Sequence, residues 1–167
     1  MELRADPFIL RAVTHEDWVL EHQLSRDAEV VRWTSYPYEL TQAEALARVT
    51  RQQERAQQGA TQRYTIWDAD SRVGTCGLGS LDQASPEAMY ALLPAARGRR
   101  IAGRALGALT GWAGTHGRLA VTLVTVEGNA ASAAVARRAG FSIVETFEDR
   151  HRDVATTLHR WRWRPLR

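Results

Sequence analysis

Cysteine, lysine and long apolar runs are scarce or absent in this sequence. These shortages exclude a disulfide, a cysteine-based metal site and a membrane span. Cys76 is the only cysteine among 167 residues, so there is no internal disulfide and no cysteine pair to bind a metal. All 22 basic residues are arginine. No run approaches the ~18 apolar residues of a membrane span, and the opening MELRADPF is too charged for a signal peptide. We therefore expect a cytoplasmic protein with no membrane partner and no metal site.

The arginines are unevenly placed along the chain. Residues 1–94 hold nine arginines against fourteen acids, whereas residues 95–140 hold seven against Glu127 alone. Residues 141–167 hold six against four acids, which closes the net charge at +3. A basic middle in a nearly neutral protein favours one site for an anionic ligand over a surface that binds a polyanion.

Apolar alternation and capping residues predict one mixed α/β domain covering residues 1–167. Thr14 followed by Asp17 predicts a helix start, and Thr41 with Glu44 forms a capping box. The expected helices begin at residue 14, lie within 27–40, and span 41–58, 99–116 and 129–139. The expected strands span 8–13, 63–67, 72–81, 87–93, 119–126, 141–149 and 153–164.

The stretch from Glu87 to Phe141 is the most specific part of the sequence. An apolar strand stops at Pro94, a turn rich in arginine and glycine follows, and a helix of small residues leads to a second apolar strand. The start of a helix leaves N–H groups without carbonyl partners and adds positive potential. A helix that begins in such a turn between two strands therefore predicts a site for a phosphorylated ligand.

The turn resembles the acetyl-CoA-binding signature of the GNAT superfamily of N-acetyltransferases, Gln/Arg-x-x-Gly-x-Gly/Ala. Residues 97–102, RGRRIA, fit it at Arg97 and Ala102. Arg100 stands where the family usually has its middle glycine, and a left-handed backbone there would cost about 1 kcal/mol or more. We expect either a turn that suits an L-residue or an altered phosphate cradle. Residues 100–105, with Gly103 in the middle, fit in a second register, but the distance from Pro94 favours the first.

Further matches extend the resemblance over nearly the whole chain and narrow it to the RimJ/RimL-like branch. They are Leu10-Arg11 with Thr14 and Asp17, Trp33-Thr34 with Pro37 and Thr41, Glu87-Ala88-Met89-Tyr90, Asn129 to Ser132 with Gly140-Phe141, and Arg152-Asp153. The resemblance implies the GNAT fold, a mixed and mostly antiparallel sheet of about seven strands with helices on both faces. It also implies acetyl-CoA as co-substrate and direct attack by an amine in a ternary complex, without a covalent enzyme intermediate or a metal.

The same resemblance implies where acetyl-CoA binds. Leu92 and Leu93 end a strand whose free backbone groups would pair with pantetheine, and an N–H near Ala91 or Leu92 would stabilise the oxyanion. Asn129 suits a helix N-cap and is also expected to contact CoA. Backbone amides and arginine side chains of the turn would hold the pyrophosphate; the expected residues are Arg97, Gly98, Arg99, Arg100, Ile101, Ala102, Gly103 and Arg104.

The reaction implied by the resemblance requires a general acid for the departing CoA and a general base for the amine. Ser132 lies where the family has a general acid for the leaving CoA thiolate, and packing alone is the alternative. Ala136 occupies the position where classical members often carry a tyrosine. An α-amine costs only about 1 kcal/mol to deprotonate at pH 7, against about 4.6 for a lysine amine, so a carboxylate acting through water suffices for an α-amine. The candidates for this base are Glu87, Glu148 and Asp149, and the sequence does not choose among them.

The resemblance implies a primary amine as the acceptor, either a protein N-terminus or a small molecule, and a homodimer is a further expectation. Acceptor contacts are expected from Trp33, Tyr36, Tyr38 and Tyr90, with packing as the alternative. Two other functions stay open. One is a CoA-binding protein without catalysis. The other is a basic RNA- or ribosome-associated module, although nucleic acid is not the expected partner. It would use the C-terminal HRWRWRPLR, where a strand places Trp161 and Trp163 on one face and Arg160, Arg162 and Arg164 on the other.

Overall fold

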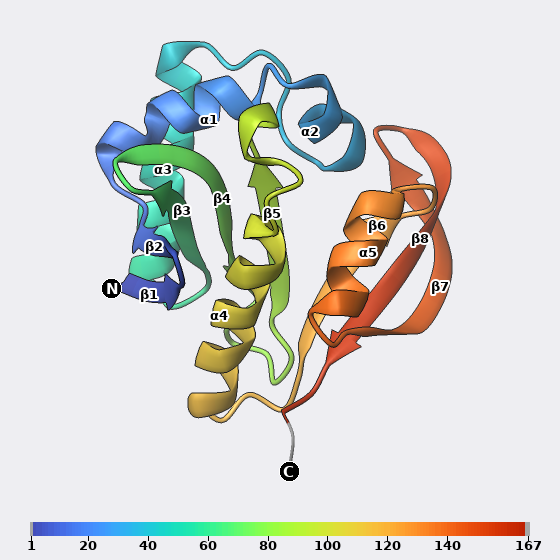
Figure 1. Cartoon of the computed structure of the whole chain (residues 1–167). Helices are drawn as coiled ribbons and strands as arrows, with labels where there is room; N and C mark the ends of the chain where they lie inside the picture. Colours follow the sequence, from blue (N-terminus) through green and yellow to red (C-terminus); the bar gives the residue numbers. More distant parts are fainter. Residues whose placement is uncertain (1, 166–167) are drawn as a thin grey trace.

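A single eight-stranded sheet runs through the computed structural model, which describes residues 2–165 (Figure 1). Its strand order is β1-β2-β3-β4-β5-β6-β8-β7. Neighbours pair antiparallel except β5 and β6, which are parallel. The strands are β1 Glu2–Ala5, β2 Phe8–Ala12, β3 Gln62–Asp68, β4 Ser71–Gly79, β5 Glu87–Leu92, β6 Val121–Val126, β7 Ser142–His151 and β8 Val154–Trp163. The mixed, mostly antiparallel sheet is thus confirmed.

The sheet has one strand more than the sequence predicted. The extra strand, β1, pairs antiparallel with β2 at the outer edge. It is four residues long and only Ala5 is buried, so its sequence carries little apolar alternation. The strand beginning predicted at residue 119 was wrong by two residues, because Leu119 is exposed and β6 begins at Val121.

Helices cover both faces of the sheet, as predicted (Figure 1). α4 and α5 lie on one face, and α1 and α3 on the other. The helices are α1 Trp18–Leu24, α2 Ala28–Trp33, α3 Gln42–Gln57, α4 Ile101–Thr115 and α5 Ala130–Arg138. The capping residues act as expected: Thr41 and Glu44 form a reciprocal capping box, while Thr14 caps a short 3-10 turn that precedes α1. None of the described helices is both long and apolar enough to cross a bilayer.

Alternate residues of β5 belong to different cores. Ala88 packs in the larger core with Ile101 and Leu106 of α4. Ala91 and Leu93 instead pack in a second cluster with residues of α1 and α2. Because successive side chains of a strand point to opposite faces, even-numbered residues of β5 face α4 and odd-numbered residues face α1 and α3.

The C-terminal basic segment is a central strand. β8 lies between β6 and β7. Trp161 is buried and Trp163 packs against the same core, which confirms the predicted face for both tryptophans. Arg160 lies on the other face, 2.8 Å from Glu145 and 3.9 Å from Glu87. Residues 166 and 167 of the predicted tail lie outside the described residues.

The tip of the β7–β8 hairpin reaches across to α2 (Figure 1). Arg152, at this tip, donates hydrogen bonds to the backbone carbonyls of Val31, Thr34 and Tyr36. His151 contacts the Arg32 carbonyl through Nε2 at 2.7 Å. These contacts join the β7–β8 hairpin to α2 and to the residues that follow it.

Candidate active site

The site begins where β5 and β6 separate. The two strands pair only at Glu87 and Thr122. The Leu93 N–H donates to Val73 on the β4 side, whereas Pro86 accepts from Thr122 on the β6 side. Because backbone groups alternate along a strand, the N–H groups of Tyr90 and Leu92 point into the gap where β6 has departed. The N–H of Ala91, which the sequence left as an alternative to Leu92, points to β4 instead.

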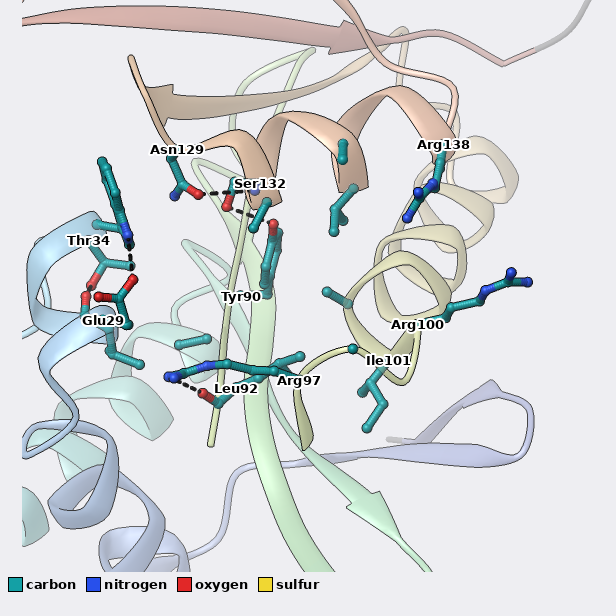
Figure 2. Close-up of a pocket in the computed structure, with 18 residues that line it drawn as sticks. Glu29, Thr34, Tyr90, Leu92, Arg97, Arg100, Ile101, Asn129, Ser132 and Arg138 are labelled. Atoms are coloured by element: carbon teal, nitrogen blue, oxygen red, sulfur yellow. Dashed lines mark hydrogen bonds between the residues drawn. The ribbon is translucent and has the colours of Figure 1, made fainter. Parts of the chain in front are cut away.

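A cavity of about 370 Å³ occupies this gap (Figure 2). Its lining is mainly apolar, as expected of a ligand pocket. Tyr90, Ala91 and Leu92 of β5 form one wall, and residues of α5 from Ala131 to Arg138 form another. The remaining lining comes from α2, from Asn129 and from the turn that opens α4.

The start of α4 presents free backbone amides to this cavity. Gly98 and Arg100 both have left-handed backbones, with φ of 75° and 61°. The first helical hydrogen bond is donated by Arg104 to the Arg100 carbonyl at 3.2 Å. The amides of residues 101–103 therefore have no carbonyl before them in the helix and carry the positive end of its dipole. This is the register that spacing from Pro94 favoured. The expectation of a turn that suits an L-residue at Arg100 was wrong, because Arg100 takes the left-handed backbone despite its side chain.

Two arginines remain available at this end of the cavity. Arg100 and Arg138 lie on the same side of it, near the α4 start and the α5 end (Figure 2). Within residues 2–165, no carboxylate lies within 4.0 Å of either guanidinium. Both are thus free to meet an anion, and a phosphate gains most from charge-assisted hydrogen bonds.

Arg97 acts within the protein itself. It forms an ion pair with Asp27 and donates a hydrogen bond to the Leu92 carbonyl at 3.0 Å. Partial burial raises the pKa of Asp27, but the hydrogen bonds from Arg97 and the Val30 N–H outweigh it and lower the pKa overall. Arg97 thereby ties the end of β5 to the start of α2.

The structure turns Arg99 of the signature, and Arg104 in the first turn of α4, away from the cavity. Arg99 pairs with Asp68 at 2.6 Å, and Arg104 donates to the Asp6 carbonyl. Neither side chain lines the cavity, and Gly103 does not line it either. The side-chain contacts to phosphate expected from Arg99 and Arg104 would thus require both to leave their present partners.

A hydroxyl pair lies at the centre of the site. The Tyr90 hydroxyl donates to Ser132 Oγ at 2.9 Å, and the Asn129 side chain accepts from the Ser132 N–H at 3.1 Å (Figure 2). Asn129 is thus a helix cap, as its sequence position suggested. Burial raises the pKa of Tyr90, which the hydrogen bond to Ser132 offsets only in part. Tyr90 therefore stays a proton donor at neutral pH, and its hydrogen bond to Ser132 does not use the proton of the Ser132 hydroxyl.

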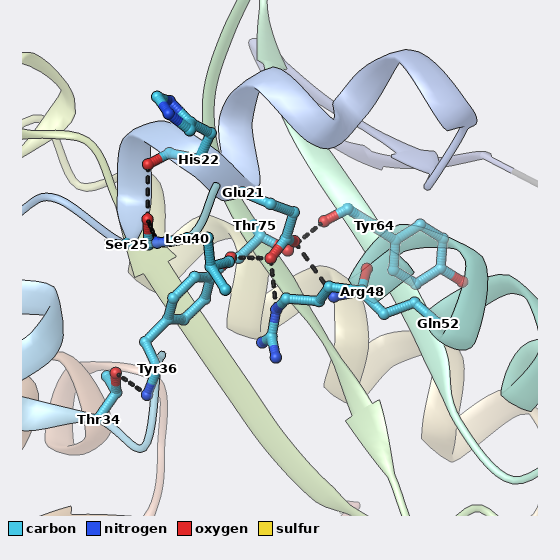
Figure 3. Close-up of polar contacts among 10 residues, drawn as sticks. All are labelled: Glu21, His22, Ser25, Thr34, Tyr36, Leu40, Arg48, Gln52, Tyr64 and Thr75. Carbon is cyan, nitrogen blue, oxygen red and sulfur yellow. Dashed lines mark hydrogen bonds and ion pairs between the residues drawn. The ribbon is translucent and has the colours of Figure 1, made fainter. Parts of the chain in front are cut away.

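The three aromatic residues expected over the acceptor site have different surroundings. Trp33 lines the cavity and donates from Nε1 to Glu29 at 2.9 Å. Tyr36 is buried and donates to Glu21, which also accepts from Arg48 (Figure 3). Burial and the Glu21 carboxylate raise the pKa of Tyr36 well above its ordinary value. Tyr38 is 63% exposed and lines neither this cavity nor a second one near Glu87.

The candidate bases do not gather at this cavity. Glu87 opens β5 and lines the second cavity, on the opposite face of the sheet. Glu148 is exposed on β7 and accepts from the Thr157 hydroxyl, and the exposed Asp149 accepts from the Arg150 N–H at 2.7 Å. Leu93, expected beside pantetheine, packs in the second core and not in the cavity lining. In the described residues, no three His, Cys, Asp or Glu side chains gather as a metal site requires.

Several lining residues were not predicted from sequence. Arg138 and Val135 share a helix face with Ser132, because they follow it at intervals of three, and that spacing could have revealed them. Glu29, Val30 and Thr34 of the α2 segment come to the cavity only through the tertiary fold. No local pattern marks them.

An open strand edge meeting a helix start defines a site for an extended ligand that carries phosphate. The chain belongs to the acetyltransferase (GNAT) domain family, whose sequence profile matches residues 8–142. A search of curated proteins found no match.

The same fold occurs in solved acetyltransferase structures at low sequence identity. RimL, the ribosomal L7/L12 alpha-N-protein acetyltransferase in complex with coenzyme A, superposes with a TM-score of 0.90 at 20% identity over 98% of both chains. The microcin C7 self-immunity acetyltransferase MccE, in complex with acetyl-CoA and AMP, gives 0.86 at 14% identity over 95% of this chain and 92% of that one. The ribosomal-protein-S5-alanine acetyltransferase from Vibrio fischeri gives 0.84 at 15% identity, over 98% and 96%.

Proposed function

We propose that this protein is an acetyl-CoA-dependent N-acetyltransferase of the RimJ/RimL type, acting in the cytoplasm on a primary amine. The amine is a protein N-terminal α-amine or belongs to a small molecule. Family membership supports acetyl transfer. The observation that carries the proposal is the meeting of the open β5 edge, the α4 amides and Ser132 in one cavity. A homodimer stays a prediction.

The residues of the cavity fit acetyl-CoA. The amides of residues 101–103, with Arg100 and Arg138, would hold the pyrophosphate. The open edge at Tyr90 and Leu92 offers backbone partners for the pantetheine amides, and the apolar lining suits its carbon chain. Acetyl-CoA supplies the thioester whose carbonyl carbon the amine attacks.

Leu92 is the proposed oxyanion donor. Its N–H points into the gap, while its carbonyl is held by Arg97 at 3.0 Å, which fixes the peptide planes at the end of β5. An N–H aimed in advance at the place where negative charge develops lowers the barrier to acyl transfer, typically by about 3–4 kcal/mol. Arg97 is a positioning residue in this scheme.

Ser132 is the proposed general acid. Because its oxygen accepts from Tyr90, its own proton is available for the sulfur of the departing CoA thiolate. The Asn129 cap fixes the backbone at Ser132. Tyr90 therefore completes a two-hydroxyl relay, a role different from the acceptor contact expected of it.

Glu87 is the proposed proton acceptor for the amine, acting through water. An α-amine with its ordinary pKa costs only about 1 kcal/mol to deprotonate at pH 7, so a carboxylate joined to it by a chain of waters suffices. Glu87 lies five residues before Leu92 in β5, about 16 Å along the strand, so the proton would have to pass through several waters. Glu87 lies on the α3 face of β5, opposite the α4 side, and is the one candidate that lines a cavity. Glu148 and Asp149 would have to approach from the exposed outer strand.

Two observations weigh against the other functions. A protein that only binds CoA has no need of the Leu92 N–H aimed into the gap or of the Ser132 hydroxyl beside it, since both serve acyl transfer. The Arg/Trp segment is a central strand with its tryptophans in the core, so it offers no aromatic surface for bases.

The test combines calorimetric titration of acetyl-CoA with acetyl transfer to a panel of N-terminal peptides and small amines. We expect micromolar binding by the native protein. Ser132→Ala should lower kcat about ten- to a hundredfold and leave the acetyl-CoA Kd within about threefold, since a general acid acts in the transition state. Ser142→Ala, at an exposed serine that begins β7, is the control. Absence of acetyl-CoA binding by folded protein would refute the proposal.

A further inference from the structure

A second cavity, of about 330 Å³, lies on the face of the sheet opposite α4. It sits between α3 and the adjoining ends of β3, β4 and β5. Its most unusual feature is its charge. Four arginines line it, Arg48, Arg51, Arg55 and Arg63, against the single carboxylate of Glu87.

The fold builds this arginine cluster from two elements. Arg48, Arg51 and Arg55 are spaced by three and four residues in α3, so they share one face of the helix. Arg63 lies near the start of β3, beneath that face. Thr41 and Glu44 cap α3, and the packing of α3 against α1 and β3 orients its arginine face.

Most of the positive charge in the cluster has no counter-ion. Arg48 is paired with the buried Glu21 at 2.6 Å (Figure 3), and Glu87 lies 3.9 Å from Arg160. Within residues 2–165, no carboxylate lies within 4.0 Å of Arg51, Arg55 or Arg63.

Arg63 shows the lack of a counter-ion most clearly. Its Nη1 is buried and has no hydrogen-bond partner among the described residues. Burial, reinforced by the nearby Arg48 guanidinium, lowers the pKa of Arg63. A buried guanidinium ordinarily has an anionic partner, because an unpaired buried charge is costly.

This cavity adjoins the acetyl-transfer site through β5. Met89 lines the arginine cavity and Tyr90, the next residue, lines the first cavity on the other face. Leu92 follows Met89 by three positions along the strand, a distance of about 10 Å. Tyr36, stacked 4.4 Å from the Arg48 guanidinium, packs in the same cluster as Ala91 and so joins the two regions.

Resting on the proposed acetyl transfer, we propose that the arginine cluster binds an anionic group of the acceptor, a carboxylate or a phosphate, held about 10 Å from the amine that is acetylated. Arg51, Arg55 and Arg63 are the specificity residues. In an extended peptide this distance corresponds to an acidic side chain two to three residues after the N-terminus, since each residue spans about 3.3 Å. In a small molecule it corresponds to an amine and a phosphate joined by a chain of about six carbons.

The test compares acceptors that differ only in charge. One arm uses a tetrapeptide amide with aspartate at its third and fourth residues and the same peptide with asparagine there. The other arm uses 6-aminohexyl phosphate and 6-aminohexanol. We expect kcat/KM for the anionic member of at least one arm to exceed that of its neutral partner about tenfold or more, and the arm with the larger ratio identifies the source of the anion.

The variant R51A/R55A should reduce this ratio to below about threefold while leaving the acetyl-CoA Kd unchanged. R4A/R26A is the matched control, because it removes two exposed arginines that line neither cavity and should keep the ratio. Arg63 is left intact because its burial makes a folding defect the expected result of its removal. A ratio near one in both arms with the native protein, or the same large ratio in R51A/R55A, would overturn the inference.

A direct binding measurement separates this inference from the proposed function. The fluorescently labelled aspartate peptide should bind the native protein without acetyl-CoA, and binding should weaken in R51A/R55A and at high salt. Acetyl-CoA binding without aspartate-peptide binding would refute the arginine subsite alone. Peptide binding without acetyl-CoA binding would refute the acetyltransferase and leave the anion site.

Discussion

Replacing Arg100 by glycine should stabilise the protein and weaken acetyl-CoA binding at the same time. Arg100 has φ of 61° and ψ of 15°, a left-handed conformation that costs an L-residue about 1–2 kcal/mol. Glycine removes that cost. It also destabilises the folded state by about 0.5–1 kcal/mol, because the unfolded chain has more conformational entropy with glycine than with arginine. The Arg100 side chain has no ion pair within residues 2–165 that its removal would break. The net gain is about 0.5–1 kcal/mol, or about 1–4 °C in Tm for a chain of this size.

The affinity change has a separate cause. Arg100 is solvent-exposed, so its contact with a phosphate is worth about 1 kcal/mol, less than a buried charge-assisted bond, and its loss should raise the acetyl-CoA Kd about fivefold. Arg100→Ala is the matched control, because alanine keeps the left-handed strain but loses the charge. It should weaken binding equally and give none of the gain in Tm.

Thermal unfolding followed by circular dichroism, with and without acetyl-CoA, measures both effects. An R100G protein that melts below the native protein would refute the strain argument. Native acetyl-CoA affinity in both variants would remove Arg100 from the phosphate site.

Three further substitutions or treatments test the surrounding structure. Glu21→Leu leaves Arg48 without its buried partner and should lower the free energy of unfolding in urea by about 3–5 kcal/mol. The double variant with Arg48→Met should recover part of that loss, and an unchanged midpoint would contradict the role of this ion pair. Burial raises the pKa of Cys76 to about 12, so at pH 8 its thiolate fraction is about a thousandfold below that of a thiol of pKa 9, and iodoacetamide should modify it only after unfolding in denaturant. Arg152→Ala removes the donor to three carbonyls in and after α2, so it should lower hydrogen-exchange protection there by about 1–2 kcal/mol and raise the KM for acetyl-CoA. Unchanged protection of α2 would exclude this contact in solution.

The fold was largely predictable because its main signals are local. The capping residues Thr14 and Thr41 begin helical turns, and Asn129 caps α5. Apolar alternation located seven of the eight strands. β1 was missed because an edge strand of four residues with one buried side chain has almost no alternation to detect.

The site was less predictable, because its side chains take partners far away in sequence. Arg99 and Arg104 look alike in a basic turn, yet Asp68 and the Asp6 carbonyl hold them away from the cavity. No pattern in the sequence identifies Asp68 or the Asp6 carbonyl as partners of these arginines. The positions of the turn, the α4 start and the β5 end were predicted better than the side chains, since neighbouring residues set them.

Strand β5 explains why the two ligands of the proposed reaction can be recognised independently. The even-numbered residues at its end, Tyr90 and Leu92, line the first cavity together with Ala91, whereas the odd-numbered residues at its start, Glu87 and Met89, line the arginine cavity. Because the side-chain period of a strand is two, a substitution on one face leaves the other in place. Acceptor selectivity can therefore change through α3 and the odd-numbered positions while the α4 turn and the Leu92 amide keep the same co-substrate.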